Sequence, residues 1–345
     1  MILKELSDAI GVSGKEGDVR AILLEAIREY VDEVKVDTMG NLLAVKRGAA
    51  SSRSDRRRMR VMLDAHMDEV GLMVVGHDKE GFLKVRSIGG IDARLLPGTL
   101  LYVGPERIPG VIGIKPVHVL EDEEWKKVIK TKDLVVDIGA KNKEEAEKIA
   151  PLGGCAAFTT KFRNLGESAN IGPTVSGKAF DDRAGCAVLV RLLRDARFSF
   201  DLHAAFTVQE EVGLRGARVA ASPIEPDCPF ALEGPIADDI PKDKDVSPTT
   251  ELSKGPALTI MDRSVIADRR LVRLLTSTGD ELEIPYQFKQ PGVGGTDAGA
   301  IHQTRVGVPS VTVAVPCRYI HSPVGILSVR DFENTVRLMR ESLSR

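Results

Sequence analysis

Residues 60–69 read RVMLDAHMDE. The run from residue 60 to residue 65 is mostly apolar and predicts a buried β-strand, which carries His66 and Asp68 at its carboxyl end. Further along the chain, predicted strands alternate with amphipathic helices, which favours an α/β fold with a mostly parallel sheet covered on both faces. The predicted helices span residues 181–197 and 331–344, and the predicted strands span residues 34–37, 42–45, 203–208, 230–232 and 310–315.

The pattern of predicted elements changes between residues 70 and 164. Short β-like runs alternate there with glycine and proline, which predicts a small β-rich module inserted into a larger domain. We therefore expect a main domain formed by residues 1–69 and 165–345 and an inserted domain formed by residues 70–164.

The composition is that of an ordinary globular protein. The 345 residues are 43% hydrophobic and 28% charged, and a net charge of -2 indicates neither a nucleic-acid partner nor an anionic membrane. No apolar run approaches the roughly 18–20 residues of a membrane span, and the N-terminus lacks the apolar stretch of a signal peptide. The four cysteines form no CxxC pair, so we expect free thiols and a cytoplasmic protein. The basic run within residues 48–58 is interpreted as a solvated loop.

Acidic residues and histidines follow several of the predicted strands or begin a predicted helix. They are His66 and Asp68, Asp181 and Asp182, Glu210 and Glu211, Glu233, and His321. Ligands of open α/β sheets bind at the carboxyl ends of the strands, so these side chains can converge on one crevice. Several carboxylates at close range repel one another, and bound divalent cations would remove that repulsion. Carboxylates and imidazoles suit Zn²⁺, Co²⁺ or Mn²⁺, and the charge count favours two ions with a bridging hydroxide.

Each cluster also has a simpler interpretation. An isolated His-x-Asp is a weak signal, adjacent glutamates usually lie on a solvated helix face, and paired aspartates often only cap a helix. The i, i+2 spacing of His66 and Asp68 nevertheless places both on one face of an extended chain, where Asp68 can accept a hydrogen bond from the far ring nitrogen. Glu210 and Glu211 point in different directions, so one can bind metal while the other acts as a base. Ser13 lies in GVSG rather than GxSxG, so a serine nucleophile is rejected.

Five stretches of the chain resemble the M42 metallo-aminopeptidases, the family of TET and glutamyl aminopeptidases. They are AHMDEVG at residues 65–71, GKAFDDR at 177–183, VQEEVGLRGA at 208–217, GGTDA at 294–298 and RYIHSP at 318–323. The match runs in order through nearly the whole chain. The resemblance implies a dinuclear metallopeptidase α/β sandwich with an inserted, PDZ-like dimerisation domain, and a homo-oligomer that can reach a hollow tetrahedral dodecamer.

The resemblance also implies the ligands of the two ions. One ion is held by Asp181, Glu211 and His321, and the other by His66, Asp181 and Glu233, with Asp181 bridging the two. The position of Glu233 is often Asp in this family, and the longer side chain keeps the charge and the oxygen donor.

The expected function is a metal-dependent aminopeptidase that removes N-terminal residues from peptides, using a hydroxide held between two divalent ions, Zn²⁺ or Co²⁺. Glu210 is the implied general base, which takes a proton from the water and delivers it to the leaving amine, and Asp68 is the second catalytic assignment.

The alternatives are a related dinuclear carboxypeptidase or deacylase, a glycosidase that uses Glu210 and Glu211, and a non-catalytic assembly protein. Adjacent residues are poorly placed to flank a glycosidic bond. The sequence leaves the preferred N-terminal residue open, and the glycine-rich residues 292–297 are expected near the pocket that selects it.

Overall fold

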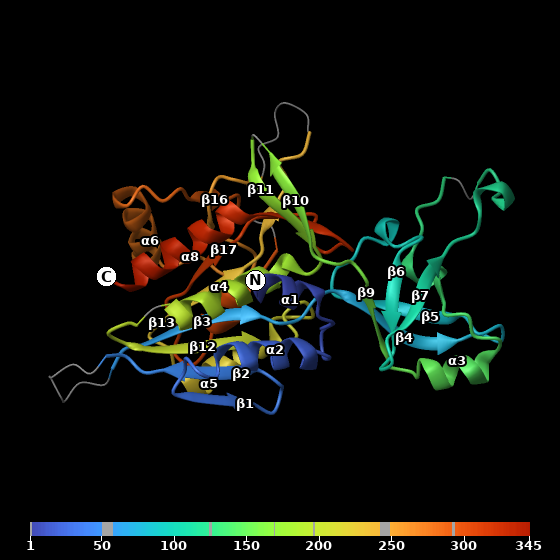
Figure 1. Ribbon diagram of the computed structural model, residues 1–345, viewed down its shortest axis with the longest axis horizontal. Helices are drawn as coiled ribbons and strands as arrows, with labels where there is room; N and C mark the ends of the chain where they lie inside the picture. The colour runs from blue at the N-terminus through green and yellow to red at the C-terminus, as the bar shows by residue number, and fades with distance from the viewer. Residues whose placement is uncertain are drawn as a thin grey trace.

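The structure is a computed structural model that describes residues 2–49, 58–123, 126–168, 170–195, 197–241, 249–291 and 294–345. Most of the basic run near residue 50 therefore lies outside the described residues. Within these ranges the strands form a large sheet, a smaller sheet and a closed barrel, with helices packed on the large sheet (Figure 1). The predicted α/β fold is confirmed.

The large sheet has the strand order β1-β2-β12-β3-β13-β17-β15-β16. Its strands are β1 (Glu33–Val36), β2 (Leu42–Lys46), β3 (Arg60–His66), β12 (Asp201–Thr207), β13 (Cys228–Glu233), β15 (Ala257–Thr259), β16 (Gln287–Lys289) and β17 (Val311–Ala314). The central strands β12, β3, β13 and β17 are parallel, whereas β2 pairs antiparallel with β12, and β15 with β17. The sheet is thus more mixed than predicted. One reason is the tight turn between β1 and β2, since so short a connection permits only antiparallel pairing.

Helices cover both faces of this sheet. They are α1 (Ile2–Asp8), α2 (Gly17–Ile27), α4 (Phe180–Asp195), α5 (Arg215–Ile224), α6 (Arg269–Glu281), α7 (Asp297–Ile301) and α8 (Val329–Leu343). Helix α4 packs on β3 and β13 and contacts α1, α2 and α8, while α5 and α7 pack together on the opposite face. Strand β3 shows the alternation that this requires, because Val61 and Leu63 enter the core under α4 and Met62 enters the core under α5.

The barrel stands beside the large sheet and has a hydrophobic core of its own (Figure 1). Its strands are β4 (Gly71–His77), β5 (Leu83–Ile88), β6 (Leu100–Val103), β7 (Ile108–Gly113), β8 (Val135–Asp137) and β9 (Cys155–Phe158), with α3 (Lys143–Ile149) against it. Alternate residues of β4, such as Leu72 and Val74, point into this core, which is the period-two pattern of strands with one buried face.

The smaller sheet was not predicted. Its strands are β10 (Arg163–Ser168), β11 (Gly172–Gly177), β14 (Ile236–Ala237), β18 (Cys317–Arg318) and β19 (Gly325–Ser328). It matters for the site because His321 lies in the connection between β18 and β19.

Two predictions made from composition can be compared with the structure. All four cysteines lie in described residues and are free thiols, as expected. Among the helices of the described residues, none is both long enough and apolar enough to cross a membrane.

Candidate metal centre

The side chains singled out in the sequence converge at the carboxyl edge of the central strands. His66 and Glu233 end β3 and β13, and Glu210 and Glu211 follow β12. Asp181 lies at the start of α4, where it and its neighbour have non-helical backbone angles, so the regular helix begins later than predicted.

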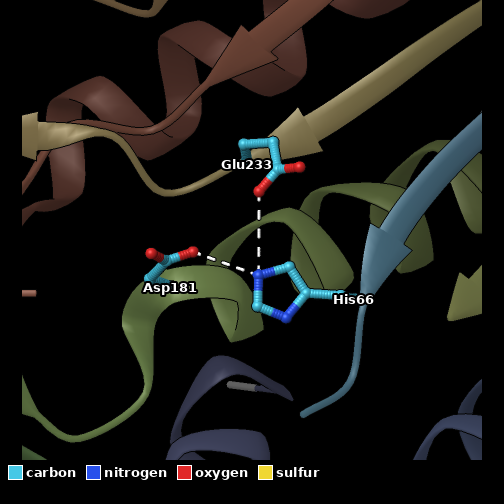
Figure 2. A group of neighbouring side chains, drawn as sticks. All are labelled: His66, Asp181 and Glu233. Atoms are coloured by element: carbon cyan, nitrogen blue, oxygen red, sulfur yellow. Dashed lines mark hydrogen bonds and ion pairs between the residues drawn. The ribbon is translucent and has the colours of Figure 1, made fainter. Parts of the chain in front are cut away.

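His66, Asp181 and Glu233 form the first of two groups that could hold a cation, with one donor atom from each residue within 4.8 Å of the others. Figure 2 shows the ring of His66 turned toward both carboxylates. His66 Nε2 lies 3.2 Å from Asp181 Oδ1 and 3.7 Å from Glu233 Oε2. An imidazole and two carboxylates are a donor set that Zn²⁺ and related ions accept.

The second group consists of Asp181, Glu211 and His321. His321 Nε2 lies 3.3 Å from Glu211 Oε2 and 3.6 Å from Asp181 Oδ2. The two oxygens of Asp181 therefore face different histidines, which is the arrangement that a bridging carboxylate needs.

A carbonyl group on the barrel side of the molecule fixes the ring of His321. His321 Nδ1 lies 2.8 Å from the carbonyl oxygen of Gly90, in the segment between β5 and β6. A donated Nδ1–H leaves Nε2 free as a donor atom for a metal. A Cβ added at Gly90 would lie 3.3 Å from Nδ1, so the approach is close enough to favour glycine.

Asp68 supports several groups of the site at once. It is fully buried and accepts hydrogen bonds from the backbone N–H of Glu210 at 2.9 Å, the backbone N–H of Glu211 at 3.2 Å and the hydroxyl of Ser13 at 2.6 Å. Its Oδ1 also faces His66 Nδ1 at 3.5 Å. The expected pairing with His66 is thus long in this structure, and the contacts to the Glu210–Glu211 segment are the shorter ones.

The neighbour of Asp181 holds the local backbone. Asp182 Oδ2 accepts the N–H of His66 at 3.1 Å, and its Oδ1 accepts the N–H of Gly185 at 2.9 Å. These contacts agree with the helix-capping interpretation of paired aspartates for this residue.

Burial and mutual repulsion shift the acid–base properties of the whole cluster. Burial raises the pKa of Glu233 to about 8 and the pKa of Glu211 to about 7, and raises the pKa of Glu210 well above its usual range. Burial lowers the pKa of His321, but hydrogen bonding to Asp181 and the charge of Glu211 outweigh it and raise the value to about 9. The raised pKa values mean that bound protons reduce the repulsion between these carboxylates. Bound cations would replace those protons, and the donor set fits two divalent ions.

Two buried acids behind the candidate ligands were missed. Asp297 accepts a hydrogen bond from the hydroxyl of Thr207 at 2.8 Å and donates its backbone N–H to Glu233 Oε1 at 3.0 Å. Asp64 is fully buried, and burial together with the charge of Asp297 raises its pKa well above the usual range. The position of Asp64 within an apolar strand was the signal that could have identified it.

A buried ion network was also missed. Lys178 Nζ contacts both oxygens of Glu69 at 2.7 Å, and Arg183 Nη2 lies 3.4 Å from Glu69 Oε1. These residues flank the candidate ligands in the sequence, and the network ties the end of β3 to the start of α4.

A cavity of about 520 Å³ opens beside the cluster. Asp181, Glu210, Glu211, Glu233 and His321 line it. Residues 292–297 were expected near such a pocket. Residues 294–296 do line it, whereas Asp297 does not, and residues 292 and 293 lie outside the described residues.

Comparisons with known proteins show which chains this one is similar to. A TET aminopeptidase from a Thaumarchaeota archaeon has a similar structure, with a TM-score of 0.91 and 38% identity, covering 100% of this chain and 96% of that one. The TET1 peptidase of Pyrococcus horikoshii, described as assembling into a tetrahedron or a large octahedral shell, has a TM-score of 0.85 and 34% identity, covering 99% and 98%.

Sequence relatives agree with the structural ones. The lysyl aminopeptidase of Pyrococcus furiosus is 33% identical over 99% of this chain and 96% of its own length. A family model described as M42 glutamyl aminopeptidase matches residues 40–338. Because the matches extend over most of the chain at these identities, the protein belongs to the M42 family of peptidases.

Proposed function

We propose that this protein is a metal-dependent aminopeptidase that removes N-terminal residues from peptides. The proposal rests mainly on the two three-residue groups, which share Asp181 and lie at the wall of a cavity. Glu210 lines the same cavity but belongs to neither group. The family and the names of the similar proteins support the same activity.

In this proposal, His66, Asp181 and Glu233 hold one divalent ion, and Asp181, Glu211 and His321 hold the other. Zn²⁺ and Co²⁺ suit these donors. When bound, such ions lower the pKa of a water molecule and polarise the carbonyl group of the scissile bond.

Glu210 is the proposed general base. Its carboxylate lies 3.9 Å from His66 Nε2, beside the first group but outside it, and it lines the cavity. The burial that raises its pKa suits a group that must take a proton from water and then deliver it to the leaving amine. Asp68 acts through Glu210, because it holds the backbone N–H of that residue.

We further propose that the chain forms a homo-oligomer, in which residues 70–164 act as an inserted dimerisation domain. The support is the separate core of the barrel and the assembly described for the Pyrococcus horikoshii peptidase. The cytoplasmic location expected from the sequence stays a prediction.

Dialysis against a chelator, followed by addition of Zn²⁺ or Co²⁺, tests the function. Hydrolysis of aminoacyl-p-nitroanilides should disappear and return, and N-acylated anilides should remain intact. Metal-independent activity would contradict the proposal, and so would a preference for N-acylated substrates, which would favour the deacylase alternative. Cleavage of p-nitrophenyl glycosides that survives the chelator would favour a glycosidase.

A further inference from the structure

Three side chains from the N-terminal part of the chain hold the segment that carries Glu210. The backbone N–H groups of residues 208–211 are four successive donors, and a side-chain oxygen accepts each of them. Asn41 Oδ1 accepts the N–H of residue 208 at 3.0 Å, and Glu16 Oε1 accepts the next N–H at 3.3 Å. Asp68 accepts the last two. Asn41, Glu16 and Asp68 thus form an acceptor set for this segment.

The backbone of this segment needs such a restraint. Strand β12 ends at Thr207, so the four N–H groups lie beyond the regular pairing of that strand. Gln209 has a left-handed backbone with a φ of 56°, and Leu214, just before α5, has a φ of 55°. Residues other than glycine rarely adopt this conformation, and they persist in it only where the surrounding structure fixes the backbone. The acceptor set supplies that restraint directly at Gln209 and at its neighbours.

Asn41 is itself firmly held. It is fully buried, and its Nδ2 donates to Asp37 Oδ2 at 2.7 Å and to the carbonyl oxygen of Gly216 at 3.1 Å. A Cβ added at Gly216 would lie 2.5 Å from Asn41 Oδ1, so only glycine fits at this position of α5 without a shift. Asn41 therefore fixes both the start of the segment, through the N–H of Val208, and the helix that follows it.

Glu16 makes its contacts through a single oxygen. Its Oε1 accepts the N–H of Gly14 at 2.6 Å as well as that of Gln209. The exposed fraction of Glu16 is 4%, and it lines a groove of about 590 Å³ whose other residues include Tyr102 and Arg107 of the barrel side. Glutamine can keep both contacts with its one carbonyl oxygen, whereas alanine loses both. Water from the groove would reach the N–H groups that alanine frees, so we expect the alanine variant to fold.

We propose that Glu16 and Asn41 are positioning residues of the reaction, which act by fixing the backbone of Glu210 and Glu211. The inference rests on the proposed function and extends its machinery to two described residues outside the cavity lining. Glu210 and Glu211 are adjacent, so a rotation of their shared backbone displaces the proposed base and a candidate ligand together. A displacement of about 1 Å can reduce turnover about 100-fold, so loss of one acceptor is enough to affect catalysis.

The test compares Glu16→Ala with Glu16→Gln in the metal-loaded protein, using the aminoacyl-p-nitroanilide that the wild type cleaves fastest. We expect kcat to fall about tenfold or more for Glu16→Ala and to stay within about threefold of the wild type for Glu16→Gln. KM should change less than about twofold in both, because the residues that line the cavity are unaltered. Asn41→Ala should lose at least as much kcat as Glu16→Ala. Elemental analysis ensures that kcat refers to chains that hold their metal.

Hydrogen–deuterium exchange gives a readout independent of turnover. In the metal-loaded protein, the amides of residues 208–211 should exchange faster in Glu16→Ala than in the wild type, and Glu16→Gln should restore their protection. Glu145→Ala is the matched control, because Glu145 Oε2 also accepts a backbone N–H, that of Lys141 at 2.8 Å on the barrel side. This variant should leave both kcat and the exchange of residues 208–211 unchanged.

A kcat for Glu16→Ala within about threefold of the wild type would overturn the inference, as would unchanged exchange of residues 208–211. An equal loss of kcat in Glu16→Gln would mean that the charge of Glu16 matters rather than its oxygen as an acceptor, and the inference would be wrong. If Asn41→Ala does not fold, the two Glu16 variants decide the question. A wild type that cleaves no anilide would remove the proposed function and the inference with it, whereas an active wild type with unaffected variants would remove the inference alone.

Discussion

Asp68→Asn is the substitution that tests most directly how the site is held. Both oxygens of Asp68 accept a backbone N–H, Oδ1 from Glu210 and Oδ2 from Glu211. Asparagine has one oxygen and one NH₂ group, so in either orientation the NH₂ group meets one of these backbone donors. The hydroxyl of Ser13 can rotate to adapt, but a backbone N–H cannot.

The size of the effect follows from these contacts. Leaving one buried N–H unsatisfied costs about 1–3 kcal/mol, and losing the carboxylate charge weakens the remaining hydrogen bond, so the free energy of unfolding should fall by about 2–4 kcal/mol. The displaced donor belongs to the proposed base or to a candidate ligand. Because a misplacement of about 1 Å can reduce turnover about 100-fold, we expect a loss of that order in kcat/KM.

Asp331→Asn provides a matched control. Asp331 is also fully buried, and its two oxygens also accept separate backbone N–H groups, from Ser253 at 2.6 Å and from Gly255 at 2.8 Å, outside the cavity lining. Urea unfolding should show destabilisation in both variants, while anilide turnover by the metal-loaded protein should fall only for Asp68→Asn. Turnover within about threefold of the wild type for Asp68→Asn, a change of less than about 1 kcal/mol, would refute the positioning role.

The remaining predictions concern the base and the metals. Glu210→Gln should retain metal and lose turnover by about 100-fold or more, because a general base is removed while the candidate ligands stay; near-normal steady-state rates would contradict the assignment. His321→Ala should lose about one metal ion per chain in elemental analysis, and full retention would show that His321 is not a ligand. Metal binding should weaken about tenfold per pH unit as the pH falls below 9, because His321, whose pKa is about 9, must release its proton first, and more steeply below pH 8, where Glu233 also holds a proton. Calorimetry in buffers of different ionisation enthalpy measures that proton, and its absence would contradict the pKa.

The central strands and the candidate ligands could be predicted because their signals are local. Strand β3 is a short apolar run, and His66 follows it directly, so the sequence places the residue at a strand end. The hairpin of β1 and β2 is confirmed for the same reason, since a turn lies between two short β-like runs. The smaller sheet could not be predicted in this way. Strand β10 is almost entirely exposed and polar, and therefore shows no hydrophobic periodicity.

Helix α6 illustrates a second limit of prediction from the sequence. Its second half contains the residues TSTG at 276–279, which are weak helix formers, so the helix depends on tertiary packing against α8. Contacts between distant segments set a third limit. Gly90 has no distinctive neighbours in the sequence, and its role arises only from the approach of the segment between β5 and β6 to His321.

The hydrogen bond between Gly90 and His321 joins two parts of the protein that have separate hydrophobic cores. Because of this contact, the barrel affects the candidate metal centre in addition to its proposed part in association between copies of the chain. Tilting it relative to the large sheet would rotate an imidazole, and cutting it away would leave that ring without the acceptor that sets its tautomer. The position of the barrel is in this way coupled to the orientation of a candidate metal ligand.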